Sequence, residues 1–420
     1  MLLSNTVANL LIRASSIVAQ LGIVPIAMTS VGRDNYGLWM TCASVATIAT
    51  ALDLGMVNTA FNVAARSRHG KAAELCVYAA VRKAAWVAFT LLVLLLVAIS
   101  TMDVDGILHT QATAGETRSI LFVVSFMSLA ALPFSVFNQL RLGRIQASSI
   151  APFLVITNLA SLPAAYLTSQ LTTSIHAFVA AATLPALLGQ AAAALWSVHQ
   201  ASSFGPLAMT RKLAAADRRV RLEGRQFFMI QLATVGAFHV DNLIIAGMLS
   251  TSDVADYSLA NRYFSIIAIM LSIYLSTAWP AYAQIARQRD SRRLRQVFLG
   301  NLASSIGFAA GVSAVLFAAR HWAFGLWTHA KVEPSAFLLL AFATFSIINA
   351  VLGNISALMN ALGLLKLQAR VSLTMLAPNL GLSILLVPRW GAAGTVVASV
   401  LCSLVMVLVY LNVLRRQKQI

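Results

Sequence analysis

The sequence predicts an all-α polytopic membrane protein, with about twelve transmembrane helices in two six-helix lobes that are related by a parallel pseudo-repeat. Three observations predict this fold class: the composition, the recurrence of long apolar runs, and an internal repeat. Of the 420 residues, 59% are hydrophobic and only 10% are charged, whereas a soluble domain usually carries about 25% charged residues. Most of the chain is therefore expected to lie in lipid.

Twelve apolar segments separated by polar turns define the expected spans. Each is long enough to cross a bilayer as a helix, which satisfies its own backbone hydrogen bonds. The first segment lacks the basic start of a cleavable signal peptide and contains Arg13, so we expect it to remain in the bundle. In chain order, the expected spans are 5–30, 37–64, 80–101, 119–140, 148–168, 175–198, 227–249, 257–284, 297–319, 335–361, 370–387 and 393–413.

The placement of Lys and Arg predicts the orientation of these spans. Of the 30 basic residues, 23 lie at the C-terminus, in the segments that follow the second, fourth, sixth, eighth and tenth spans, or in the first few residues of the span after such a segment. Five lie in the segments on the opposite side, and only Arg13 and Arg262 lie farther inside spans. Because short cytoplasmic loops are enriched in Lys and Arg, both termini are expected on the cytoplasmic side.

Two basic runs, at 211–225 and 286–295, are expected to be cytoplasmic loops that contact anionic lipid head groups. They lack the aromatic platforms of a nucleic-acid-binding surface, so no nucleic-acid partner is expected. The first run lies in the longest loop and is a natural linker between two halves. The expected domains are an N-terminal lobe at 1–204, a basic linker at 205–226 and a C-terminal lobe at 227–420.

The internal repeat emerges when the two halves are aligned with a shift of about 221 residues. The segments 138–147 and 360–369 share the pattern N-x-L-x-L-x-[R/K]-x-Q-A. Weak identity in a nearly constant register is typical of an ancient duplication. Because each half holds six spans, both enter the membrane in the same sense, which predicts a parallel repeat. The paired positions are Gln20 with Asp241, Tyr36 with Tyr257, Asp53 with Tyr274, Arg66 with Arg287 and Asn158 with Asn379.

Four ionisable residues are predicted inside spans, where a charge is costly and by default faces a cavity or a partner. Arg13 lies about 12 Å along the first helix at 1.5 Å per residue, which favours either a cation facing a cavity or an ion pair with Asp53. Asp53 itself is then a counter-ion or a coupling-ion site. Arg262 lies near the start of its span, where it either faces the cavity or extends to the lipid head groups.

Asp241 lies in a polar cluster with His239 and Asn242. This cluster predicts either a site for a proton or cation or a polar contact between helices. Gln20 and Asn58 are further polar residues inside spans. Polar contacts between helices account for most residues of this kind, and we also consider these two as candidates for the lining of a substrate cavity.

An enzymatic function is not expected. The chain lacks the motifs H-E-x-x-H, G-x-x-x-x-G-K-[S/T] and G-x-S-x-G. His321 and His329 share a loop without further metal ligands, and the three cysteines are scattered in apolar segments. Neither a metal site, a cofactor nor a disulfide framework is therefore predicted.

The run NYGLWMTCASVATIATALDLGMVNTAFNVAAR at 35–66 carries the pattern Y-G-x-[W/F]…D-[L/F]-G-[L/M]…N across the second span. The run GRDNYG, and the Asn-Leu pair that precedes LLVPRWGAAGTVVAS, are similar in style. On these features the whole chain resembles the polysaccharide flippases of the multidrug/oligosaccharidyl-lipid/polysaccharide exporter superfamily. It departs from a symmetric pattern at Tyr274, because the carboxylate of Asp53 is not duplicated in the second half.

The resemblance implies a transporter that flips undecaprenyl-pyrophosphate-linked oligosaccharide repeat units from the inner to the outer leaflet of a bacterial plasma membrane. Transport would proceed by alternating access and serve the synthesis of O-antigen, exopolysaccharide or capsule. Arg13 and Arg262 would contact the phosphates, and Asp53 or Asp241 would bind H⁺ or Na⁺. Expected partners are the lipid-linked oligosaccharide, the bilayer, a polysaccharide polymerase and a chain-length regulator.

Three alternatives remain. A multidrug or toxic-compound extruder of the same superfamily would need an acidic cavity for organic cations, whereas two Arg and two Asp inside spans are balanced and favour an anionic substrate. A peptidoglycan-precursor flippase usually looks like a longer relative with fourteen spans. A membrane-embedded glycosyl-transfer enzyme is disfavoured by the short outer loops.

Overall fold

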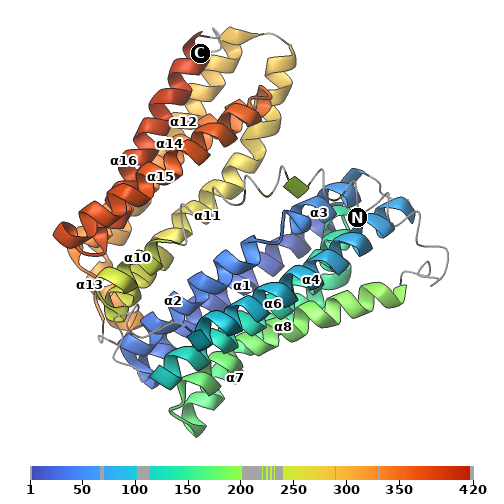
Figure 1. Cartoon of the computed structure of the whole chain (residues 1–420). Helices are drawn as coiled ribbons and strands as arrows, with labels where there is room; N and C mark the ends of the chain where they lie inside the picture. Colours follow the sequence, from blue (N-terminus) through green and yellow to red (C-terminus); the bar gives the residue numbers. More distant parts are fainter. Residues whose placement is uncertain are drawn as a thin grey trace. The chain divides into compact units, whose positions relative to one another are not determined.

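The structure, a computed structural model, describes residues 2–66, 71–101, 114–200, 220, 224–225, 228, 231, 240–288, 290–329 and 332–416. Within these ranges every regular element is a helix, as predicted. The chain divides into two compact units, Met1–Val235 and Gly236–Ile420, which we call lobe 1 and lobe 2. Figure 1 shows the helices of both lobes, coloured along the chain.

Lobe 1 is built around one central helix. This helix, α6, packs against α2, α3, α4 and α8, while α7 packs between α1 and α8. Alanine is the most frequent residue in the buried core that α3, α4 and α6 share, and its small side chain allows the helices to approach closely. The helices of lobe 1 are α1 (Leu2–Ser30), α2 (Gly32–Ala51), α3 (Met56–Arg66), α4 (Lys71–Thr101), α6 (Ala114–Gly143), α7 (Ala147–Leu171) and α8 (Ile175–Gln200).

Lobe 2 repeats this plan around α14, which packs against α11, α12 and α16, while α15 packs against α10 and α16. Capping side chains begin three of its helices: Ser250, Asp290 and Ser335 each accept a backbone N–H in the first turn. The helices of lobe 2 are α10 (Asp241–Met248), α11 (Thr251–Arg287), α12 (Ser291–Ala318), α13 (Arg320–Trp327), α14 (Ala336–Ala361), α15 (Leu365–Trp390) and α16 (Ala393–Arg416).

The number of spans agrees with the prediction where the chain is described. Ten helices are long and apolar enough to cross a membrane, or eleven if the bent pair α2 and α3 counts as one span. About half of the seventh expected span, 227–249, lies outside the described residues, and α10 forms its C-terminal end. The short helix α13 was not predicted, because it lies in a segment expected to be an outer loop.

The structure also supports the repeat. When the sequence is shifted by 221 residues, the segment from α2 to α3 aligns with α11. Both segments end at paired residues, Arg66 and Arg287. The helix pairs that pack in lobe 1 correspond to those that pack in lobe 2. The motif shared by the segments 138–147 and 360–369 differs in one respect, the point at which the helix ends. Helix α6 ends at Gly143, the sixth residue of the motif, whereas α14 ends at Ala361, the second residue and about one helical turn earlier.

The second expected span is not one continuous helix, and this prediction was wrong. The chain breaks at residues 52–55, and α2 and α3 meet there with a bend of 53°. Two residues in the break have left-handed backbone, Leu54 with φ 57° and Gly55 with φ 73°, a conformation that a leucine rarely adopts. In lobe 2, α11 runs without a break through the paired position Tyr274.

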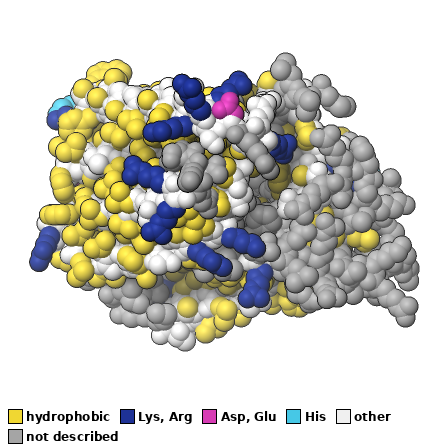
Figure 2. Space-filling model, turned by 90° about the horizontal axis from the view of Figure 1, so that it is seen from above, with side chains coloured by type: hydrophobic (Ala, Val, Ile, Leu, Met, Phe, Trp, Pro, Cys, Tyr) yellow, Lys and Arg dark blue, Asp and Glu magenta, His cyan; other side chains and the backbone are white. Residues whose placement is uncertain are grey.

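Basic side chains gather at one end of the helices of lobe 2. Lys and Arg predominate among the charged side chains on the face shown in Figure 2. This end is formed by the last turn of α11, the start of α12, the start of α15 and the end of α16. Its exposed basic residues are Arg287, Arg292, Arg293, Arg295, Lys366, Arg370, Arg415 and Arg416.

Close packing of α3 on α6 requires a glycine at residue 143. A Cβ at Gly143 would lie 2.6 Å from the Phe61 carbonyl oxygen and 2.7 Å from the Ala64 Cβ. We therefore expect Gly143→Ala to separate the two helices and to lower the melting temperature of the protein in lipid nanodiscs, measured by tryptophan fluorescence.

The matched control is Gly115→Ala on the same helix, where nothing lies within 4 Å of an added Cβ. This change should leave stability unaltered or raise it by about 0.5–1 kcal/mol, because alanine favours a helix over glycine. Equal melting temperatures for the two variants would contradict the proposed close packing.

Candidate functional site

Helix α1 carries three chemically different faces. Residues spaced by three and four positions form each face, as expected for a helix. The buried face packs on α7: the Asn5 side-chain oxygen accepts hydrogen bonds from the Ser148 amide and hydroxyl, and Ser15 accepts one from Asn158. A second face is apolar and exposed, and consists of Val7, Leu10, Leu11 and Val18.

The third face is polar, and we call it the polar stripe. Its residues repeat at intervals of three and four positions, and all except Ser16 are exposed, with Ser16 partly buried. Gln20 donates a hydrogen bond of 3.1 Å to the Ser16 hydroxyl, which keeps the two side chains aligned along the helix. The polar stripe consists of Thr6, Asn9, Arg13, Ser16 and Gln20.

An exposed polar stripe on a spanning helix is costly against lipid, and polar groups inside spans generally face protein or a water-filled cavity. The stripe carries one cation, two hydroxyl groups and two amides, but no carboxylate. Arg13 and Gln20, two of the predicted candidates, lie on this common face, two helical turns apart. Chemically, the stripe offers hydrogen-bond donors and a guanidinium for an anion or a hydroxylated ligand.

Asp53 lies in the break between α2 and α3 and is fully buried. Its two carboxylate oxygens accept hydrogen bonds from the Gly55 and Val57 amides, at 2.8 and 2.9 Å. Gly55 directly precedes α3 and Val57 lies in its first turn, where backbone amides have no partner within the helix. A carboxylate is also favoured there by the helix dipole. Asp53 therefore holds the broken span together locally.

The predicted ion pair between Arg13 and Asp53 is not among the ion pairs of the described residues. The reason is geometric: Arg13 lies on an exposed face of α1, while the Asp53 oxygens point to backbone amides. Their proximity could not be judged from sequence, because it depends on which face each helix presents to its neighbours.

Asp241 lies at the start of α10 and is buried. The Tyr257 hydroxyl, from α11, donates a hydrogen bond of 2.7 Å to one Asp241 oxygen. This contact joins two helices of lobe 2. It also places a repeat-marking tyrosine next to an intramembrane carboxylate, a pairing that sequence analysis did not foresee. His239, the expected neighbour of Asp241, lies outside the described residues.

The other two candidates are more dispersed. Asn58 is exposed on the first turns of α3 in lobe 1, and Arg262 is partly buried on α11 in lobe 2. Beside Arg262, the Tyr263 hydroxyl donates to the Leu316 carbonyl of α12, which fixes this part of α11. Among the described residues, no cluster of three or more His, Cys, Asp or Glu could hold a metal ion.

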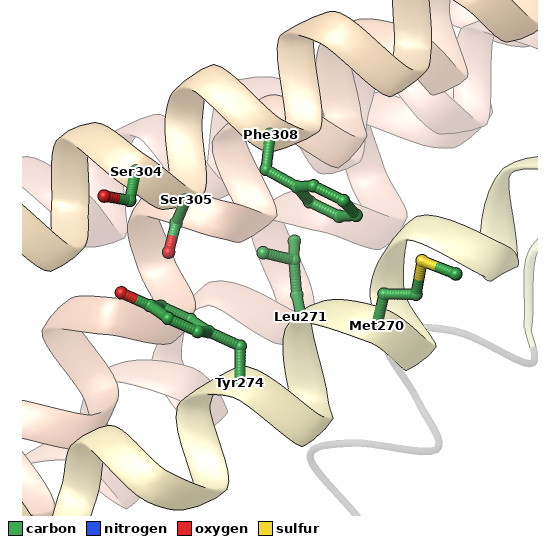
Figure 3. A pocket seen from close by; sticks show the side chains of 6 residues that line it. All are labelled: Met270, Leu271, Tyr274, Ser304, Ser305 and Phe308. Atoms are coloured by element: carbon green, nitrogen blue, oxygen red, sulfur yellow. The ribbon is translucent and has the colours of Figure 1, made fainter.

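A pocket of about 320 Å³ lies between α11 and α12, within lobe 2. Figure 3 shows that Tyr274, the residue paired with Asp53 in the repeat, lines it together with Ser305 and Phe308 from α12. Sequence analysis missed this pocket. The sequence gives only a weak indication of the pocket, because hydroxyl and aromatic residues are common in spanning helices. The lining residues are Met270, Leu271, Tyr274, Ser304, Ser305 and Phe308.

The polar stripe was also missed as a unit, although its signal is present. Thr6, Asn9 and Ser16 follow the same helical spacing as Arg13 and Gln20. A search for polar residues at helical spacing, rather than for ionisable residues alone, would have found them.

Comparison with known proteins identifies the fold. No protein-family model and no curated protein sequence matches the chain. The chain is similar to an inward-facing multidrug resistance MATE family transporter of the MOP superfamily, with a TM-score of 0.73 and 15% identity over 96% of this chain and 94% of that one. It is also similar to the lipid II flippase MurJ in an inward closed conformation, with a TM-score of 0.72 and 11% identity over 99% and 88%.

A third similar structure is the MATE multidrug transporter DinF-BH, with a TM-score of 0.62 and 16% identity over 97% of this chain and 96% of that one. Identities this low establish the fold alone. The chain is thus a multi-pass membrane protein with the two-lobed fold of these transporters.

Replacing Asp53 tests its local role. Asp53→Ala should destabilise the protein by about 1–2 kcal/mol, because the start of α3 loses its capping acceptor. Asp53→Asn keeps one acceptor oxygen and should lose less. Denaturant unfolding in nanodiscs measures both changes. Asn58→Ala, an exposed change in the first turn of α3, is the control and should have little effect. Unchanged stability of Asp53→Ala would contradict the capping role.

Replacing Tyr257 tests the buried contact with Asp241. Tyr257→Phe should cost about 1–3 kcal/mol, because it removes the hydroxyl donor from a buried carboxylate. The control is Tyr263→Phe, which removes a hydrogen bond to a neutral backbone carbonyl and should cost about 1 kcal/mol. If thermal unfolding shows the control to be the more damaging change, the contact does not stabilise the lobe as we expect.

Proposed function

We propose that the protein flips undecaprenyl-pyrophosphate-linked oligosaccharide repeat units from the inner to the outer leaflet of a bacterial inner membrane. In this proposal both termini are cytoplasmic, transport proceeds by alternating access, and the product is used for surface polysaccharide. The fold of known transporters supports a transport function in general. The choice of substrate depends on the chemistry of the intramembrane residues.

The observation that carries the proposal is the different placement of positive and negative charge. Arg13 is exposed on the polar stripe, in the middle of a spanning helix. Asp53 and Asp241, the two carboxylates expected inside spans, are both buried and engaged in hydrogen bonds. A ligand that approaches the stripe therefore meets a guanidinium and amides rather than a carboxylate.

This chemistry suits a pyrophosphate-linked glycan. A guanidinium binds phosphate oxygens with two parallel hydrogen bonds and stays charged at any physiological pH. The amides of Asn9 and Gln20 can bond sugar hydroxyls, and the polyprenyl tail can remain in lipid. Arg262 is the candidate second phosphate partner and Asn58 a further candidate for the cavity lining.

A coupling ion has two candidate sites. Both oxygens of Asp53 are occupied by backbone amides, whereas Asp241 has one oxygen bonded to Tyr257. We therefore favour Asp241 as the residue that binds H⁺ or Na⁺. A polysaccharide polymerase and a chain-length regulator are the expected protein partners, because each acts on the flipped product or its polymer.

A multidrug extruder has the same fold, and DinF-BH is an example. An organic cation would be repelled by Arg13 and would find no carboxylate on the polar stripe, so we rank this function second. The substrate of a peptidoglycan-precursor flippase would find the same favourable chemistry on the polar stripe. Only a transport experiment with each substrate separates that function from our proposal.

The test is Arg13→Ala in a strain that lacks the chromosomal gene. Surface polysaccharide should fall about tenfold or more, since a charge-assisted hydrogen bond contributes about 1.5–3 kcal/mol. Arg13→Lys should restore part of it, because the charge returns without the bidentate geometry. The polysaccharide is quantified after confirming equal amounts of protein in the membrane.

Arg370→Ala is the matched control: it removes an exposed cation from the basic end of lobe 2 and should leave polysaccharide near the normal amount. Normal polysaccharide in Arg13→Ala would reject the phosphate role. A deletion strain that loses viability or resistance to cationic dyes, but keeps its polysaccharide, would favour one of the other two transport functions.

A further inference from the structure

The pocket between α11 and α12 is formed entirely by residues of lobe 2. Its side chains are uncharged: three carry hydroxyl groups, and the others are aromatic or aliphatic. Tyr274 and Phe308 are 37% and 38% exposed, so the pocket is accessible from the surface of the lobe. Apolar walls with a few converging polar groups are typical of small-molecule sites.

The first feature that points to a ligand is the Ser305 hydroxyl. Ser305 is only 1% exposed, and its hydroxyl has no hydrogen-bond partner among the described residues. By contrast, its neighbour Ser304 donates to the Gly300 carbonyl of its own helix. Figure 3 shows the Ser305 hydroxyl pointing from α12 toward Tyr274 on α11. A buried hydroxyl without a partner is unfavourable. Of the five buried serine hydroxyls of this kind among the described residues, Ser305 is the one that lines the pocket.

The second feature is a chain of hydrogen bonds that begins at the pocket. The Tyr274 hydroxyl donates to the Asn301 side-chain oxygen at 2.8 Å, and the Asn301 amide donates to the Tyr282 hydroxyl at 3.0 Å. Tyr282 then donates to Asn354 of α14 at 3.5 Å. Because the Tyr274 proton is directed to Asn301, a ligand that bonds to the Tyr274 hydroxyl has to be the donor. The chain thus fixes an acceptor at the pocket wall.

We propose that this pocket binds an uncharged sugar ring. The proposal rests on the proposed flippase function and assigns a site to part of the glycan. The apolar face of the ring lies against Phe308 and Leu271. Its hydroxyl groups donate to Tyr274 and exchange a hydrogen bond with Ser305. The lipid pyrophosphate is not bound here, because no lining residue carries a charge.

Other ligands fit the pocket less well. A hydrocarbon chain would fill the pocket without offering a partner to the buried Ser305 hydroxyl, which would stay unsatisfied. A phosphate group would find no cation, and an organic cation would find no carboxylate among the lining residues. A hydroxylated ring supplies both the apolar face and the missing hydrogen-bond partner.

The experiment measures binding of neutral methyl glycosides to the full-length protein by saturation-transfer NMR. The protein is held in lipid nanodiscs, since maltoside detergents would themselves compete as sugars. The probes are the methyl glycosides of glucose, galactose, mannose, rhamnose and N-acetylglucosamine, with xylitol as a hydroxylated compound without a ring. At least one glycoside should give a signal at least fivefold above that of xylitol.

Ser305→Ala and Phe308→Leu should each lower that signal at least fivefold. Ser313→Ala is the matched control, since its hydroxyl is also buried on α12 without a partner among the described residues but does not line the pocket. This variant should retain the signal within twofold. Size-exclusion profiles and melting temperatures are compared for all three variants, and Phe308→Leu supplies the answer if Ser305→Ala does not fold.

Two results would overturn the proposal: no glycoside exceeds xylitol, or the Ser313→Ala control loses as much signal as Ser305→Ala. Displacement of the bound glycoside by farnesol, with Ser305→Ala still binding farnesol normally, would also overturn it in favour of a hydrocarbon site. Loss of polysaccharide in Arg13→Ala is a separate result. A glycoside signal, together with a deletion strain that keeps its polysaccharide, would leave the pocket standing while the proposed flippase function fails.

Discussion

A bilayer offers no hydrogen-bond partner to a peptide group, so each N–H and C=O at membrane depth must find one within the protein. The long helices of both lobes meet this constraint along their length. The interrupted span of α2 and α3 cannot, because its break frees amides at the start of α3. Asp53 supplies two acceptors at this point. The presence of Asp53 in an apolar run is thus explained by the backbone amides that it binds, and no role in transport is needed to account for it.

The same constraint explains why the two lobes are alike in plan and different in detail. Equivalent helices pack around α6 and α14, so the duplicated scaffold has been retained. In lobe 2, α11 is continuous and needs no capping carboxylate, and the paired residue Tyr274 lines a pocket instead. Where the backbone requirement disappears, the side chain becomes available for a different role. Gln20 and Asp241 show the same divergence, since one is exposed and the other buried.

The polar groups that bear on the proposed function are of two kinds. Those with partners inside a lobe, such as Asp241 with Tyr257, hold helices together. Those on accessible surfaces form the polar stripe of α1 and the wall of the α11–α12 pocket. The first surface carries a cation and the second is uncharged, which matches the two parts of a lipid pyrophosphate glycan, its phosphates and its sugars. Both proposed binding surfaces follow from that division.

Composition, apolar periodicity and the constant register of the repeat determined the fold class, the approximate spans and the two-lobe plan, because these depend on local helix formation and transfer into lipid. The identities of Arg13, Asp53 and Asp241 as unusual residues were also evident from sequence. The hydrogen-bond partners of these residues were not evident from sequence. Whether Asp53 meets Arg13 or a backbone amide depends on the break at residues 52–55 and on which helix face is buried. Likewise, Ser305 and Tyr274 come together only because α11 and α12 pack side by side. Such contacts join residues far apart in the chain, and only tertiary packing decides them.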